Sequence, residues 1–158
     1  MRILFSLLCV LALGVVGCSG TAGADGSEFP EAEAAALQAL KEFHQAFNAR
    51  DEEAWAATLN YPHVRFSSSG NVTVWDTPEE YMAGFDFGAF EALNPGWDHS
   101  AWDSIEIVQS GPDKVHVALQ FSRYDAEGNV LSTFKTFHIM TNQDGHWGTQ
   151  SRSSYAVP

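Results

Sequence analysis

Cysteine and basic residues are both scarce in this sequence. Its 158 residues include two cysteines, Cys9 and Cys18, and eight Lys or Arg against 20 Asp or Glu, for a formal net charge of −12. The basic residues form no cluster. Nucleic-acid binding needs a positive footprint, so the composition excludes that class of partner. The acidity also disfavours direct docking of the domain on anionic lipid. Keeping a small domain soluble is a sufficient explanation for the negative net charge.

The sequence has no apolar run of the length that an ordinary transmembrane helix needs, which is about 20 residues. The run from Ile3 to Val16 holds no charged side chain and follows the single positive charge of Arg2. A charged start, a short apolar core and a small-residue exit are typical of a secretory signal. We therefore expect residues 1–17 to be a signal peptide that is absent from the mature chain.

The exit of that run contains a cysteine. The segment Val15-Val16-Gly17-Cys18-Ser19 resembles the lipobox that the lipoprotein signal peptidase recognises. The resemblance implies that the Cys18 thiol receives a diacylglyceryl group and that cleavage leaves Cys18 as the first residue. Two acyl chains attach a protein stably to a bilayer, since each buried CH₂ contributes about 0.8 kcal/mol. The alternative is a plain secretory signal with an accidental cysteine.

The lipobox interpretation predicts the compartment and the domain organisation. It places the chain in a bacterial cell envelope, bound to the lipid bilayer through Cys18. The residue after Cys18 is Ser19 and not Asp, which slightly favours the outer membrane over the inner one. Residues 18–29 are rich in Gly, Ser and Ala and predict a flexible tether. Residues 30–158, about 130 in number, fit one domain. Because Cys9 leaves with the signal, that domain has no intrachain disulfide.

No motif for a metal or cofactor is recognisable in the sequence. No two histidines have the i, i+4 spacing of a zinc site, and a single mature cysteine cannot build a structural one. No glycine-rich loop is available to hold a phosphate. The letters Ser132-Thr133-Phe134-Lys135 match the S-x-x-K of penicillin-binding enzymes, but they fall on a predicted strand and the partner motifs are missing. We therefore expect no cofactor.

Helical periodicity is confined to the first half of the domain. Leu37, Leu40, Phe43 and Phe47 recur every three or four positions and predict a helix over 30–49. Asp51 predicts the N-cap of a short second helix that ends near Tyr61-Pro62. The capping box Thr77-Pro78-Glu79-Glu80 opens a third helix, which Gly84 and Gly88 weaken or bend and Asn94-Pro95-Gly96 ends.

The rest of the domain has the period of strands. Residues 64–66 and 72–74 alternate in polarity around the turn Ser68-Ser69-Gly70-Asn71 and predict a hairpin. After Trp97, strands are expected near 100–110, 114–124, 130–142 and 146–155, separated by Gly-, Pro- and Asn-containing turns. Three helices, an early hairpin and a late antiparallel meander indicate an α+β fold in which a strongly curved antiparallel sheet wraps around the helices.

This order of elements resembles the nuclear-transport-factor-2-like superfamily, which includes SnoaL-like and ketosteroid-isomerase-like domains. The start of the last strand, Asp144-Gly145-His146-Trp147-Gly148, is similar to the Asp-Gly-x-Trp of many members, and the stretch 97–124 looks like a bacterial subgroup without assigned activity. The resemblance covers about residues 30–157 and implies a cone whose open end forms a pocket. Members are enzymes, binding domains or dimerisation modules, so the fold alone does not choose a function.

The densest group of chemically active side chains lies between Trp97 and Asp103. In ketosteroid-isomerase relatives, a carboxylate in an apolar cone moves a proton. The resemblance therefore suggests Asp98 or Asp103 as a general base, with His99 as a proton carrier. The simpler interpretation is that Asp98 follows a turn and that the tryptophans belong to the core.

Other residues are candidates for the wall of the pocket. Arg123 is in phase with the apolar face of its strand, so it either enters the mouth of the cone and binds an anion or pairs with Asp125 or Glu127 beyond the core. The facing of His138 is left open because both faces of its strand carry apolar residues. The remaining pocket candidates are Tyr81, Trp97, Trp102 and Arg152.

Two classes of function remain. The first is a lipid-anchored cone domain that binds a small apolar or amphipathic molecule or a protein partner, with the outer face around His116, Ala118 and Gln120 available for a homodimer. The second is a cofactor-free isomerase, dehydratase or hydrolase that uses Asp98, Asp103 or His99 as general acid–base groups, with Tyr81 or Arg123. The enzyme requires a carboxylate or histidine inside an apolar cavity with a donor in reach.

Overall fold

A computed structural model describes residues 27–156 of the chain, and the predicted signal peptide and Cys18 lie outside them. The helices are α1 (Pro30–Asn48), α2 (Glu52–Ala57), α3 (Pro78–Ala83) and α4 (Phe87–Leu93), and the strands are β1 (Leu59–Phe66), β2 (Val72–Trp75), β3 (His99–Gly111), β4 (Lys114–Tyr124), β5 (Val130–Gln143) and β6 (His146–Ser154). None of these helices has the length and apolar character needed to cross a bilayer.

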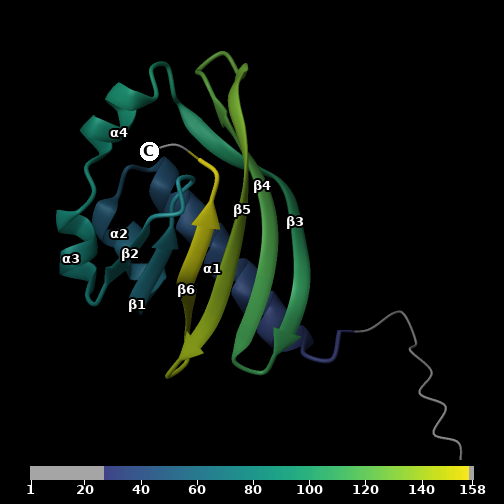
Figure 1. Cartoon of the computed structure of the whole chain (residues 1–158). Coiled ribbons are helices and arrows are strands. Elements are labelled where there is room, and N and C mark those ends of the chain that lie inside the picture. The colour runs from purple at the N-terminus through teal and green to yellow at the C-terminus, as the bar shows by residue number, and fades with distance from the viewer. Residues whose placement is uncertain (1–26, 157–158) are drawn as a thin grey trace, which may run out of the picture.

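The strands form one curved sheet in the order β2-β1-β6-β5-β4-β3. The meander from β3 to β6 is antiparallel throughout, as predicted, and β1 joins it by running parallel to β6. Figure 1 shows α1 lying along the concave side of this sheet, with α2, α3 and α4 on the side remote from β3. The α+β cone expected from the sequence is therefore confirmed.

The helix α1 is held by the apolar stripe seen in the sequence. Leu40 is fully buried, and it belongs to one core cluster with Val115 and Val117 of β4 and Met140 of β5. Phe43, one turn further along, is buried in a second cluster with the side chains of α2, α3 and α4. The two clusters fill opposite ends of the cone, so the C-terminal end of α1 faces the helical side.

Two predicted helices differ from the observed ones. The second helix ends at Ala57, because Leu59 already pairs with Thr149 of β6 and the Thr149 amide donates to the carbonyl of Thr58 at 3.1 Å. The third helix is divided into α3 and α4. Gly84 ends α3, and the Asp86 side chain caps α4 by accepting the Ala89 amide.

The close approach of β6 to β1 depends on Gly148. A Cβ at this position would lie 3.0 Å from the carbonyl carbon of Leu59 and 3.0 Å from the oxygen of Thr58, both backbone atoms. Gly148→Ala is therefore expected to lower the free energy of unfolding by about 1–3 kcal/mol, the usual cost of overpacking. Gly111→Ala is the control, since its nearest contact would be 3.7 Å away. Equal urea midpoints for the two variants would contradict the expectation.

Candidate ligand pocket

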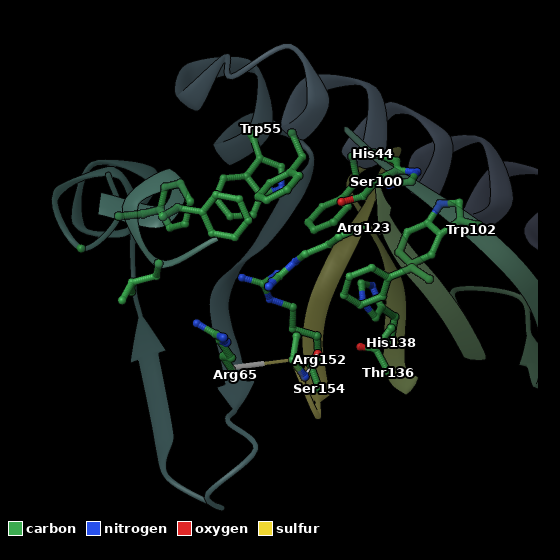
Figure 2. Close-up of a pocket in the computed structure, with 18 of the residues that line it drawn as sticks. His44, Trp55, Arg65, Ser100, Trp102, Arg123, Thr136, His138, Arg152 and Ser154 are labelled. Carbon is green, nitrogen blue, oxygen red and sulfur yellow. Dashed lines mark hydrogen bonds between the residues drawn. The ribbon is translucent and has the colours of Figure 1, made fainter. Parts of the chain in front are cut away.

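A cavity of about 260 Å³ opens at the helical end of the cone. It lies between the C-terminal end of α1, the segment from Gly84 to Leu93, and the ends of β1, β4 and β6 (Figure 2). Its volume is close to the lower end of the range of small-molecule sites, about 300–1,000 Å³. The lining residues are Phe43, His44, Phe47, Trp55, Arg65, Gly84, Phe85, Asp86, Ala89, Phe90, Leu93, Ser100, Trp102, Phe121, Arg123, Thr136, His138, Arg152, Ser154 and Ala156.

Aromatic rings form a large part of the wall. Trp55, at the base of this wall, is 1% exposed and packs edge-on against Phe85, with ring centroids 4.7 Å apart, and against Phe47 at 5.0 Å. Trp102 and Phe121 close the opposite side, at 5.9 Å from each other. Such rings present a large, rigid apolar surface to a ligand.

Three arginines from three different strands enter this apolar wall. Arg65 is on β1, Arg123 on β4 and Arg152 on β6, and Figure 2 shows their guanidinium groups turned toward the same region of the pocket. Arg123 donates to the Asn94 side chain, and its guanidinium carbon lies 4.9 Å from the centre of the Phe90 ring.

Arg152 is positioned by a phenol and a tryptophan. Its Nη2 donates to the Tyr81 hydroxyl at 2.9 Å, and its guanidinium carbon lies 5.4 Å from the centre of the Trp55 ring. Stacking on aromatic faces is a preference of arginine that lysine does not share to the same degree. The two contacts hold Arg152 at the boundary between the aromatic wall and the cavity.

The arginines remain charged at neutral pH despite their surroundings. Burial lowers the pKa of Arg65 to about 10, and the neighbouring charge of Arg152 acts in the same direction. Burial alone lowers the pKa of Arg123 to about 10. Both values are well above 7, so the pocket of this acidic protein is itself positively charged.

Histidines near the pocket are neutral. Burial lowers the pKa of His44 to about 4, and the electrostatic interaction with His99 acts in the same direction. Burial, with Arg152 as the next cause, holds the pKa of His138 well below its usual range and lowers that of His63 to about 3. The Nδ1 of His63 lies 2.9 Å from the Thr149 carbonyl oxygen, which suits the neutral ring with a proton on that nitrogen.

Several residues expected at the pocket lie there. Trp102, Arg123, His138 and Arg152 line it, and Tyr81 stands directly behind Arg152. His138, whose facing was open, points inward and is 2% exposed. Trp97 is instead a core residue outside the lining. Arg123 enters the mouth of the cone, which is the first of the two placements expected from the sequence.

The three acid–base candidates lie outside the pocket lining. Asp98 and His99 pair with each other at 2.9 Å, with 54% and 43% of their side chains exposed. Asp103 is exposed and accepts a hydrogen bond from Ser122, because consecutive strand residues face opposite sides and Trp102 takes the inner one. The placement removes the geometry that proton transfer by Asp98, His99 or Asp103 in this cavity would require.

Sequence reasoning missed Arg65 and His44. Val64 and Phe66 suggested the apolar face of the hairpin, but Phe66 is 42% exposed, and Arg65 lies on the inner face of β1. His44 directly follows the buried Phe43 on α1 and packs against Trp102, with ring centroids 4.5 Å apart and planes tilted by 37°. The described residues contain no group of three or more His, Cys, Asp or Glu side chains that could hold a metal ion.

Fold and pocket together define an α+β cone domain with a basic, aromatic cavity at its open end. The sequence matches the family described as NTF2-like protein (DUF6841) over residues 32–154, and the chain belongs to this family. No curated protein matches it.

Solved structures with the same fold come from several bacteria. A protein of unknown function with a cystatin-like fold from Nostoc punctiforme has 16% identity and a TM-score of 0.62, covering 80% of this chain and 91% of its own. Aln2 from a Streptomyces species has 19% identity and a TM-score of 0.63 over 79% and 90%. A ketosteroid isomerase-like protein from Erwinia carotovora atroseptica has 20% identity and a TM-score of 0.58 over 80% and 96%.

Proposed function

We propose that this chain is an exported, membrane-anchored lipoprotein whose NTF2-like domain binds a small molecule in the cone pocket. The observation that carries the proposal is the cavity of about 260 Å³, walled by aromatic rings and containing a few convergent polar groups. This combination is the usual character of a small-molecule site. The acid–base candidates lie outside the cavity, which favours binding over the proposed proton-transfer chemistry.

The position of α1 is compatible with an anchor at Cys18. The helix has 19 residues and is therefore about 28 Å long. The tether would leave from its N-terminus at Pro30, whereas His44 and Phe47 near its C-terminus line the pocket. Attachment to a bilayer through residues 18–29 would leave the mouth of the pocket accessible.

The anchor is tested by changing its cysteine. Cys18→Ser removes the thiol that lipid would occupy, so the protein is expected to move from the membrane fraction to the soluble fraction of its host. Cys9→Ser is the matched control, because Cys9 is expected to leave with the signal peptide, and this variant should stay with membranes. Membrane retention of Cys18→Ser would show that the lipobox interpretation is wrong.

The pocket is tested by filling it. Ala89 of α4 lines the cavity, and the exposed Ala92 of the same helix does not. Native mass spectrometry of the mature protein extracted from its host is expected to show a retained small molecule in the wild type and in Ala92→Trp. Ala89→Trp should lose most of it, because the indole narrows the cavity. No retained molecule in the wild type, or equal retention in both variants, would contradict binding in this pocket.

A further inference from the structure

We propose that the pocket selects organic acids: Arg65 and Arg152 bind the oxyanion of the ligand, and the aromatic wall holds its apolar body. This inference rests on the proposed small-molecule function and names its ligand class. It follows from the unused hydrogen-bond donors of the two arginines, the scarcity of acidic residues around them and the neutral polar groups of the wall.

Arg65 is the clearest indication of a missing partner. It is half-buried, and no hydrogen bond or ion pair joins its guanidinium to any other residue between 27 and 156. Its Nε is inaccessible to water and has no acceptor. A buried donor without a partner costs about 1–3 kcal/mol, and more when it is charged. An arginine kept in this state is suited to a ligand that supplies the acceptor.

Arg152 also has unused donors. The one hydrogen bond of its guanidinium within the described residues goes to the neutral hydroxyl of Tyr81, and its buried Nε has no acceptor. Its charge lowers the pKa of Arg65, so the two guanidinium groups repel each other. A carboxylate between them would accept paired N–H donors and relieve the repulsion.

The pocket contains almost no internal counter-charge. Among the described residues that line it, Asp86 is the sole carboxylate, and it is exposed and already accepts the Ala89 amide as the cap of α4. Arg123 adds a third positive charge to the lining, and its Nη1 donates to the side-chain oxygen of Asn94. Buried charge of one sign requires compensation, and a bound anion provides it.

The remaining wall defines the rest of the ligand. Phe85, Phe90 and Phe121 line the cavity with apolar rings, while His44 and His138 are neutral and add no charge at pH 7. A cationic ligand would meet three arginines, and a neutral one would leave the charges of Arg65 and Arg152 uncompensated. The chemistry that fits is a carboxylate or a similar oxyanion attached to a compact aromatic or aliphatic body.

The test uses pairs of probes that differ only in charge. Benzoate, 2-naphthoate and octanoate, each with its neutral primary amide, are titrated into the full mature protein at pH 7.5 by isothermal titration calorimetry. At least one acid is expected to bind 10- to 100-fold more tightly than its amide, the factor that a charge-assisted hydrogen bond supplies. Arg65→Gln should remove this preference and leave the affinity for the amide within twofold.

A matched control and a second variant keep the outcome unambiguous. Lys135→Gln removes one positive charge from an exposed position of β5 and should not alter the preference. Arg65→Lys retains the charge without the paired donors and should lie between the wild type and Arg65→Gln. Equal binding of acids and amides would overturn the anion proposal while the pocket's function stands. If no probe of either kind binds and no retained molecule is found, both proposals fail.

Discussion

Acidification from pH 7 to 4.5 is expected to destabilise this domain steeply. His44, His63 and His138 are neutral in the folded protein because burial lowers each pKa, to about 4 for His44, to about 3 for His63 and well below the usual range for His138. In the unfolded chain each titrates near 6.5. Below pH 6.5 the unfolded state therefore binds more protons, and falling pH favours unfolding until the folded-state pKa values are reached.

The slope of this effect is large because three groups act together. One neutral histidine contributes about 1.4 kcal/mol per pH unit, so three contribute on the order of 4 kcal/mol per unit between pH 6 and 4.5. A typical domain is stable by about 5–15 kcal/mol, so a loss of about 6 kcal/mol over this window removes a large part of the stability. Urea denaturation at pH 7, 6, 5 and 4.5 measures the slope.

Single substitutions identify the groups responsible. His63→Gln and His44→Gln should each reduce the slope by about 1.4 kcal/mol per pH unit. His116→Gln is the control, because His116 lies on β4 outside the pocket lining and is not among the charges that act on the three buried histidines. A stability that is level between pH 7 and 4.5, or a slope that only His116→Gln alters, would contradict the burial of neutral histidines.

Removal of the Trp55 side chain is expected to have the second large effect. The indole is 1% exposed and lies within 5.1 Å of the Phe47, Tyr81 and Phe85 rings, measured between centroids. Trp55→Ala should lower the free energy of unfolding by about 3–5 kcal/mol, since the cavity left behind adds to the lost burial. It also removes the ring beneath Arg152, so binding of an organic acid should weaken in any protein that remains folded.

Tyr155→Ala provides the comparison for Trp55→Ala. Tyr155 is also aromatic but is 72% exposed. Its replacement should change stability by less than about 0.5 kcal/mol, as is usual for surface positions. Similar urea midpoints for the two variants would show that Trp55 does not have the packing described.

Sequence patterns predicted the helices and strands that are determined by residues close together in the chain. The stripe of α1 and the alternation of Val115, Val117 and Leu119 are both properties of neighbouring residues, and both faces are buried as expected. Arg123 continues the β4 alternation, so its inward position could be anticipated as one of two options. The N-cap of α3 at Thr77 could also be predicted from the sequence. Its hydroxyl accepts a hydrogen bond from the Glu80 backbone amide, as a capping box predicts.

The features that escaped prediction depend on distant parts of the chain. The parallel pairing of β1 with β6 joins residues about 90 positions apart, as in Leu59 with Thr149. It also decides which face of β1 is inner, and therefore that Arg65 enters the pocket while Phe66 is exposed. Hydrophobic alternation indicated the opposite face, because the inner face of β1 at the mouth of this cone carries the charged Arg65 where an apolar residue would be expected.

The organic-acid pocket is tested most directly by ¹H–¹⁵N NMR of the mature protein with the tightest-binding acid from the titrations. The arginine Nε–H and tryptophan indole signals report individual side chains on the pocket wall. The largest shifts are predicted for Arg65, Arg152 and Trp102, with little change at Trp147, which does not line the cavity. Shifts confined to residues outside the cavity, or of equal size at Trp147 and Trp102, would contradict binding of the acid by the arginines of the cone.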